Sequence, residues 1–307
     1  MTRVVLLAGG TGGTKLAHGF ALLGDEVSLT VIANVGDDAQ IHGLHVCPDI
    51  DALLYTLSGL IDSERGWGLR GDTSNAQEMF ARLGAPTWFR LGDADLATNV
   101  HRTRLLRDGA SLTDATAAMA SALGIAARIL PATDDALRTR IQTDEGELEF
   151  QDYFVRRRQE PKVRGIRFDG IPPARPTAAV LSAIGEAELI VIGPSNPIVS
   201  IGPILALPGI RGAIAGADVP RIAVSPIIGG RALKGPADRM LASLGHESSA
   251  AGVARVYEGL IDHFVLDETD AALRPEIESS TLLPTIMRTE EDRIGLARAL
   301  IGVAKPG

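Results

Sequence analysis

The feature that most constrains the fold is an N-terminal segment in which a strand runs into a glycine-rich turn and then a helical pattern. Val4–Leu7 is a short aliphatic run, residues 8–15 read Ala-Gly-Gly-Thr-Gly-Gly-Thr-Lys, and Gly13–Leu23 has helical character. Units of this kind build parallel sheets covered by helices. The segment therefore predicts a Rossmann-like α/β fold with a mostly parallel sheet.

The same alternation continues along the chain. Further strands are predicted at Val27–Ala33, Leu189–Ile192 and Ile222–Val224, and helices at Asp49–Leu60, Thr73–Leu83, Asp95–Arg107, Ser111–Leu123, Thr177–Gly185 and Ala237–Leu244. One region differs, because Leu137–Thr143 and Glu147–Tyr153 flank Asp144-Glu145-Gly146, which indicates a hairpin. We expect one α/β domain over residues 1–307, with an antiparallel insertion or edge extension at about residues 137–170.

Composition excludes several classes of protein. The 307 residues carry a formal net charge of −8 and only 4% aromatic residues, which disfavours a general nucleic-acid binder. The single cysteine, Cys47, cannot form an internal disulfide, and the sequence shows neither a signal peptide nor a long apolar run. These features predict a cytoplasmic protein with no membrane partner.

The glycine-rich turn is the first candidate site. Glycines let backbone N–H groups approach an oxyanion closely, and the following helix presents its positive end to it. The alternative is a turn in which glycines only permit tight packing. The spacing fits neither a Walker loop nor a dinucleotide fingerprint, so NAD binding is disfavoured. The candidate phosphate contacts are Gly9, Gly10, Thr11, Gly12, Gly13 and Lys15.

The second candidate site is acidic. Asn34-Val35-Gly36-Asp37-Asp38 follows the second predicted strand, and Pro48-Asp49-Ile50-Asp51 opens a helix. Asp49 and Asp51 could simply stabilise the start of that helix. Two adjacent acids at the edge of a sheet repel each other unless a cation is present, and Mg²⁺ is the usual partner of carboxylates that face phosphates. We therefore predict Mg²⁺ as a cofactor, with Asp37 and Asp38 as its first candidate ligands, while the role of Asp49 stays open at this point.

Two later loops end apolar strands and should reach the same crevice, since ligands bind at the carboxyl ends of parallel strands. The loop Gly193-Pro194-Ser195-Asn196-Pro197, with Ser200 beyond it, is a rigid polar turn. The loop after Val224 carries Arg231 and Lys234 between glycines, so these two are candidate phosphate clamps or solvated surface cations. Ser195, Asn196 and Ser200 complete the predicted nucleotide contacts.

Three further residues give weaker signals. His42 and His45 are three positions apart and show no third ligand in the sequence, which makes a poor transition-metal site. Cys47 has no sign of activation and is interpreted as a small packed residue.

Taken together, these blocks resemble the CofD/FbiA family of transferases from coenzyme F-420 biosynthesis. The resemblance runs from residue 3 to about residue 240 and is carried by Gly9–Gly13, Asn34–Asp38, His42–Asp51, Tyr55–Leu57, Arg65–Gly68, Leu91–Thr98, Leu130–Asp135, Gly193–Gly202 and Ser225–Gly229. The segment after about Leu241 carries no motif of this kind.

The resemblance implies a Mg²⁺-dependent, homodimeric enzyme. Its donor would be a three-carbon acid linked to guanosine diphosphate, of the lactate or enolpyruvate type, its acceptor the deazaflavin Fo, and its released product GMP. The Asn34–Asp38 block and Asp49 would form the metal and catalytic side, with Asp38 or Asp49 orienting the acceptor hydroxyl or taking its proton. Asp51 and Arg90 would contact Fo.

The sequence does not distinguish the donors. It contains no pattern for a covalent intermediate, so direct in-line transfer is favoured. The main alternative is a nucleotide-sugar-binding regulator without enzymatic activity, because YvcK-like proteins resemble the same glycine loop and paired acids. Their sequence after the paired acids is rich in serine and glycine, whereas this chain has His42-Gly-Leu and Pro48-Asp-Ile-Asp51.

Overall fold

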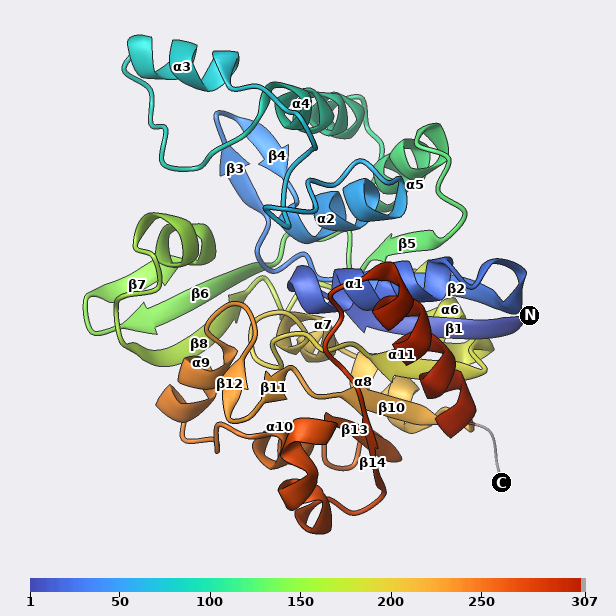
Figure 1. The fold of residues 1–307 in the computed structure, drawn as a ribbon. Coiled ribbons are helices and arrows are strands. Elements are labelled where there is room, and N and C mark those ends of the chain that lie inside the picture. The colour runs from blue at the N-terminus through green and yellow to red at the C-terminus, as the bar shows by residue number, and fades with distance from the viewer. Residues whose placement is uncertain (305–307) are drawn as a thin grey trace.

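A computed structural model describes residues 1–304 of the chain. Its centre is a seven-stranded sheet in the order β14-β13-β10-β9-β1-β2-β5, and all neighbouring strands are parallel (Figure 1). The strands are β1 (Thr2–Ala8), β2 (Val27–Ala33), β5 (Arg128–Pro131), β9 (Leu189–Ile192), β10 (Arg221–Val224), β13 (His263–Asp267) and β14 (Ser280–Leu283). The predicted α/β fold with a parallel sheet is therefore confirmed.

Strand order creates a switch point between β1 and β9. The chain moves from β1 to β2 and β5 on one side, whereas β9, β10, β13 and β14 extend the sheet on the other. Leu7 pairs with Ile192, and Ala8 pairs with Ala33, so the loops after β1, β2 and β9 leave the sheet at one edge. Crevices at such switch points are where open α/β sheets bind ligands.

Helices lie on both faces of the sheet and beyond it (Figure 1). They are α1 (Gly10–Ala21), α2 (Pro48–Leu57), α3 (Asn75–Arg82), α4 (Asp93–Arg107), α5 (Leu112–Ala122), α6 (Ala178–Glu186), α7 (Gly202–Ala206), α8 (Ile210–Ala215), α9 (Ala237–Ser243), α10 (Ala250–Val256) and α11 (Glu290–Val303), with 3₁₀ segments η1 (Gly24–Glu26) and η3 (Glu268–Glu276). In Figure 1 α1 and α11 pack together in front of the sheet, and α6 and α8 lie behind it. Helices α3 and α4 are set apart, over the hairpin of residues 39–46. Helix α1 starts at Gly10, three residues before its predicted start, so the glycines form its first turn.

Three smaller antiparallel sheets lie outside the central one. They are β3 (Ala39–Ile41) with β4 (Leu44–Val46), β11 (Ile227–Ile228) with β12 (Arg231–Ala232), and the sheet β7-β6-β8, formed by β6 (Arg138–Thr143), β7 (Gly146–Glu149) and β8 (Val163–Asp169). The last is the predicted antiparallel element, and it is a sheet of its own rather than an edge extension. The strand predicted over Glu147–Tyr153 ends at Glu149, and a π-helical turn, η2 (Asp152–Arg156), follows. Buried Tyr153 packs there in a separate apolar cluster with Ile141 and Val163.

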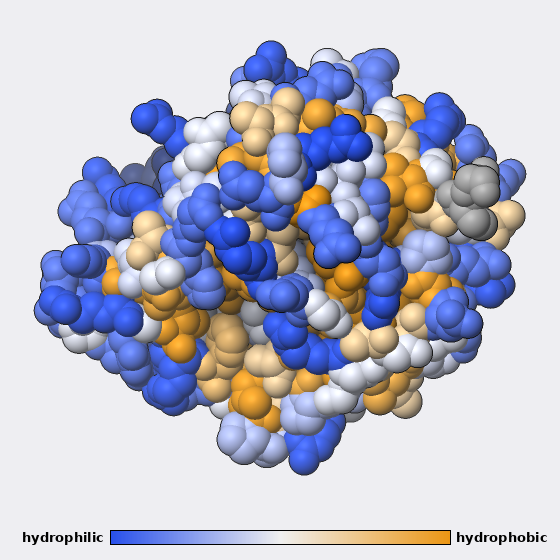
Figure 2. Space-filling model, turned by 90° about the horizontal axis from the view of Figure 1, so that it is seen from below, coloured by the Kyte–Doolittle hydropathy of each residue, from blue (hydrophilic) through white to orange (hydrophobic). Residues whose placement is uncertain are grey.

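The main apolar core surrounds the central strands. Strand β9 is buried along its whole length, and most of β1 and β2 is buried with it, as continuous apolar strands covered on both faces should be. The face seen in Figure 2 has its apolar side chains in separate patches between hydrophilic ones. None of the helices in the described part of the chain is long and apolar enough to cross a membrane.

Candidate active site at the sheet switch point

The glycine turn lies tightly against the loop after β9. A Cβ atom on Gly12 would come 2.0 Å from the carbonyl oxygen of Pro194, and one on Gly13 would come 2.6 Å from Ser195 Oγ. The backbone N–H of Gly9 donates to the same Ser195 hydroxyl at 3.3 Å. Because these glycines have no side chains, the turn after β1 packs directly against the loop after β9. This packing places the N-terminus of α1, whose first N–H groups have no partners within the helix, at the crevice.

Asp49 connects the glycine turn to the acidic block. Its Oδ1 accepts a hydrogen bond from the backbone N–H of Gly10 at 2.6 Å, and its Oδ2 accepts one from Asn34 Nδ2 at 3.0 Å. Pro48 occupies the first turn of α2 and fixes the start of the helix that carries Asp49. The first and second candidate sites are therefore one site, as the sequence predicted.

Asn34, at the end of β2, organises the carboxylates. Its side-chain oxygen accepts the N–H of Gly36 at 2.8 Å, which shapes the loop, and its amide nitrogen donates to both Asp37 Oδ1, at 3.2 Å, and Asp49. One uncharged amide thus holds two acids that would otherwise repel each other.

The carboxylates are buried with little compensating charge. Asp37 is 7% exposed and Asp49 6%. Burial, followed by the charges of Asp49 and Asp38, raises the pKa of Asp37 well above its usual range. Burial also raises the pKa of Asp49 to about 6, although the hydrogen bonds from Asn34 and Gly10 oppose the shift. A divalent cation would relieve this repulsion, and carboxylate oxygens are the ligands that Mg²⁺ prefers.

Asp38 faces a different set of partners. Its Oδ2 lies 3.1 Å from His45 Nε2 on β4 and accepts a hydrogen bond from Cys47 Sγ at 3.1 Å. Gln40 Nε2 lies 3.4 Å from the other ring nitrogen of His45. A carboxylate can only accept, so in the contact with Asp38 the donor is Nε2 of His45. The Oδ1 of Asp38 is buried and has no hydrogen-bond partner among the residues described here. Asp38 therefore has one fixed oxygen and one free oxygen.

A cavity of about 230 Å³ reaches Asp38 and His45 from the side of α4, α5 and β5. Its lining includes Ser111, Asp134 and Arg138. The cavity gives a small molecule a path to the acidic block.

Asp51 is committed to an ion pair. It is buried on α2 and accepts hydrogen bonds from both terminal nitrogens of Arg102, one of them at 3.2 Å. Arg102 also donates to Asn99 Oδ1 at 2.8 Å and to the carbonyl oxygen of His45. Burial raises the pKa of Asp51 even though Arg102 lowers it. The pair holds α2 against α4, and the role of Asp51 as an Fo contact stays a prediction.

Arg90, the other predicted Fo contact, lies exposed on the segment between α3 and α4. Its role likewise stays a prediction. On the same side of the molecule, Tyr55 of α2 donates to Asp95 of α4 at 2.7 Å, and burial raises the pKa of Asp95 to about 6.

Other predicted nucleotide contacts lie against the same glycine turn. Ser195 is buried against Gly9, and Ser200 lies beside the turn, since a Cβ on Gly9 would come 2.9 Å from its Cβ. Asn196 accepts the N–H of Ile198 at 2.9 Å and so shapes the loop itself. Thr11 lies half-buried in the first turn of α1.

Cationic side chains gather beyond the first turn of α1. Lys15 donates to the carbonyl oxygen of Met287 at 2.8 Å, and its pKa is lowered by burial and then by the nearby charges of Arg293 and Lys234. Arg231 and Lys234 lie exposed on the segment from β12 to α9. Sequence reasoning missed Arg293, because it lies on α11 in a part of the chain without motifs. It also missed the joining of Asp38, His45 and Cys47, which only the β3–β4 hairpin brings together.

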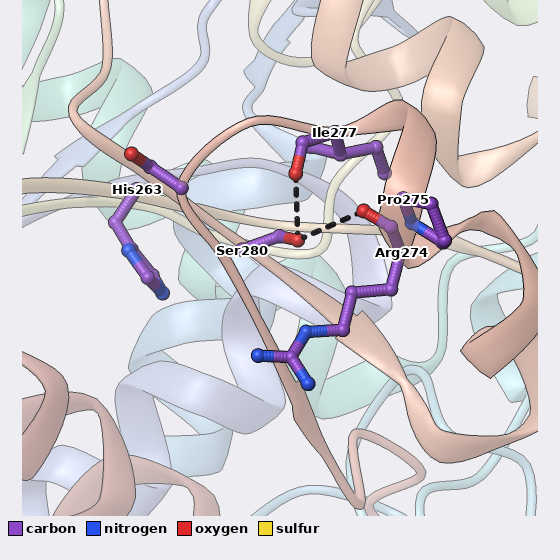
Figure 3. Close-up of a pocket in the computed structure, with 6 residues that line it drawn as sticks. His263, Arg274, Pro275, Ile277 and Ser280 are labelled. Carbon is purple, nitrogen blue, oxygen red and sulfur yellow. Dashed lines mark hydrogen bonds between the residues drawn. The ribbon is translucent and has the colours of Figure 1, made fainter.

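A larger, open cavity of about 560 Å³ lies at the other edge of the sheet. It is formed where β13 and β14 begin, with His263, Arg274 and Ser280 in its lining (Figure 3). The hydroxyl of Ser280 is directed at the carbonyl oxygens of Ile277 and Arg274. No residue predicted for the site lines this cavity, which is therefore separate from the switch point.

Comparisons with known proteins identify the family of the chain. The family described as "2-phospho-L-lactate transferase CofD" matches residues 4–289. A phosphoenolpyruvate transferase of Streptomyces griseus is 41% identical over 99% of this chain and 98% of its own. A 2-phospho-L-lactate transferase of Methanosarcina mazei is 44% identical over 88% of both chains.

Among solved structures, a protein of the UPF0052 family from Bacillus halodurans shares the fold. Its TM-score is 0.63 over 98% of this chain and 100% of that chain, at 16% identity. At that identity the likeness concerns the fold alone. The family match and the two relatives, in contrast, cover nearly the whole chain, including every loop of the candidate site, and the chain therefore belongs to the CofD family of transferases.

Proposed function

We propose that this protein is a Mg²⁺-dependent transferase of coenzyme F-420 biosynthesis. It would move a phosphorylated three-carbon acid, phospholactate or phosphoenolpyruvate, from a guanosine-diphosphate-linked donor to the ribityl hydroxyl of Fo, with release of GMP. The observation that carries the proposal is the contact of Asp49 with Gly10 at the switch point. It joins a buried carboxylate to the N-terminus of α1, and helix N-termini at such switch points favour the binding of phosphate.

The acidic side of the site fits Mg²⁺. Asp37, Asp38 and Asp49 are buried, two of them have raised pKa values, and Asp38 Oδ1 has no partner in residues 1–304. These three side chains would hold the ion through their oxygens. When bound, Mg²⁺ would neutralise the charge of the diphosphate and of the carboxylates themselves.

The chain's own residues would hold the donor diphosphate and the acceptor hydroxyl in position for the transfer. The N–H groups of the first turn of α1, with Lys15, would bind the diphosphate, while Ser195 and Ser200 would fix the β9 loop against it. The acceptor hydroxyl would approach Asp38 from the 230 Å³ cavity. Its oxygen would form a bond to the phosphorus next to the acid as the bridging bond to GMP breaks, and Asp38 or Asp49 would take the proton.

The phosphoenolpyruvate transferase and the 2-phospho-L-lactate transferase are about equally similar to this chain, so similarity does not identify the donor. The test is to incubate the protein with Fo, Mg²⁺ and equal amounts of the guanosine-diphosphate-linked lactate and enolpyruvate donors. We expect GMP in equal amount to a deazaflavin product whose mass identifies the preferred donor. Absence of GMP and of product with either donor would overturn the proposal. The homodimer and the cytoplasmic location that the resemblance implies stay predictions.

A further inference from the structure

We propose that Asp38, His45 and Cys47 form a binding site for a borderline-soft divalent cation of the Zn²⁺ type. The three residues offer a carboxylate oxygen, an imidazole nitrogen and a sulfur, and these atoms lie within 4.8 Å of one another. Oxygen-only sites suit Mg²⁺, whereas a set containing nitrogen and sulfur suits Zn²⁺. This site thus differs chemically from the proposed Mg²⁺ site, whose ligands are all carboxylates, although Asp38 belongs to both sites.

The geometry is close to what Zn²⁺ needs. Asp38 Oδ2 lies 3.1 Å from both His45 Nε2 and Cys47 Sγ. In a tetrahedral site with metal–ligand distances of about 2.0–2.3 Å, ligand atoms lie roughly 3.3–3.7 Å apart. The three side chains therefore need only small movements to take up the ion. His45, on the short β3–β4 hairpin, keeps 19% of its side chain exposed and has room to move.

The surroundings support binding in three ways. The 230 Å³ cavity borders Asp38 and His45, so it offers an entry path and space for a water molecule as fourth ligand. One carboxylate and one thiolate balance the charge of a divalent ion, so the occupied site would be neutral. Gln40 lies next to the second ring nitrogen of His45. With its amide turned, it would accept the Nδ1 proton of the metal-bound tautomer, which is the usual second contact of a ligating histidine.

Binding is a proton exchange with no redox step. Cys47 gives up its thiol proton to solvent as the sulfur bonds to the ion, and His45 shifts its proton from Nε2 to Nδ1. Zn²⁺ would bind Oδ2 of Asp38, whereas Mg²⁺ would bind its Oδ1. Two divalent ions on one carboxylate repel each other, so Zn²⁺ would weaken the binding of Mg²⁺. That consequence, inhibition, rests on the proposed function; the metal site itself does not.

Co²⁺ is a spectroscopic substitute for Zn²⁺ and gives the direct test. Cys47 is the single cysteine of the chain, so any thiolate-to-cobalt charge-transfer band must arise from it. We expect wild-type protein titrated with Co²⁺ to show this band and tetrahedral d–d bands, saturating at one ion per chain with release of one proton, and Zn²⁺ to bleach them. The Cys47→Ser variant should lose the charge-transfer band, and both Cys47→Ser and His45→Gln should bind Co²⁺ at least about tenfold more weakly.

A matched control is His101→Gln, which removes an exposed histidine from α4 and should leave the spectrum unchanged. Should Cys47→Ser not fold, His45→Gln alone still tests the site. The proposal is overturned if wild-type protein shows no charge-transfer band, or if the cobalt spectrum is the same in folded His45→Gln. None of these readouts depends on transferase activity, so a failed assay with Fo and a failed metal site remain distinguishable.

Discussion

Replacing Asp49 by asparagine is expected to lower the rate of transfer to Fo by about 10²-fold or more, the usual cost of losing a metal ligand or general base. The change removes one negative charge and keeps the shape of the side chain. The asparagine oxygen can still accept the N–H of Gly10, although its amide nitrogen then faces that of Asn34 and loses the hydrogen bond that Asp49 accepts there. The loss should therefore appear in kcat, measured as GMP release at saturating donor and Fo.

Stability should change much less than activity. Burial disfavours the charged form of Asp49, as its raised pKa shows, so neutralising the side chain favours folding, whereas loss of the hydrogen bond from Asn34 opposes it. The control is Asp262→Asn. Asp262 pairs with Arg221 at the amino ends of β10 and β13, away from the carboxyl ends where the site lies, so the change should leave kcat unchanged. A folded Asp49→Asn variant with near wild-type kcat would remove Asp49 from the chemistry.

Replacing Arg102 by alanine is expected to lower the free energy of unfolding by about 3–5 kcal/mol, because it leaves Asp51 buried without its countercharge. Arg102 is 0% exposed and bonds to Asp51, Asn99 and the carbonyl oxygen of His45. Its loss would free α4 from both α2 and the β3–β4 hairpin. Urea denaturation followed by circular dichroism would measure the change.

Arg104→Ala, on the same helix, is the control for Arg102→Ala. Its ion pair with Asp108 is exposed, so its loss should cost no more than about 0.5 kcal/mol. Replacing both buried partners by apolar residues, Asp51→Leu with Arg102→Met, should recover most of the stability lost in the single variant. Equal costs for Arg102→Ala and Arg104→Ala would show that the buried pair does not hold the helices together.

Four of the five inner strands of the sheet follow from sequence. The predicted bounds of β2 and β9 agree with the structure residue for residue, because β9 is a continuous apolar run and β2 is interrupted only by Ser28 and Thr30. Strands β5, β13 and β14 were missed: β5 and β14 form the two edges of the sheet, whereas β13 is an inner strand with four of its five residues buried. An edge strand has no need of a long apolar run, and the residues of β14 are all only half-buried.

The sequence predicted those parts of the candidate site that follow from one rule, namely that ligands bind at the carboxyl ends of parallel strands. Loops at the carboxyl ends of β1, β2, β9 and β10 were expected at one crevice. Gly10, Asp49 and Ser195 meet there. Lys234 of the β10 loop lies close enough to Lys15 for its charge to lower the pKa of Lys15. Contacts that depend on tertiary packing could not be predicted. Arg102 reaches Asp51 across 51 residues, and Lys15 lies close enough to Arg293, near the C-terminus, for that charge to lower its pKa.

A crystal structure of the protein with GDP and Mn²⁺, an anomalous scatterer that can replace Mg²⁺, tests the central claim most directly. We expect a manganese peak bonded to carboxylate oxygens of the Asp37, Asp38 and Asp49 group, with the diphosphate lying between it and the N–H groups of the first turn of α1. Manganese bound only elsewhere, or a diphosphate remote from Gly9–Gly13, would contradict it.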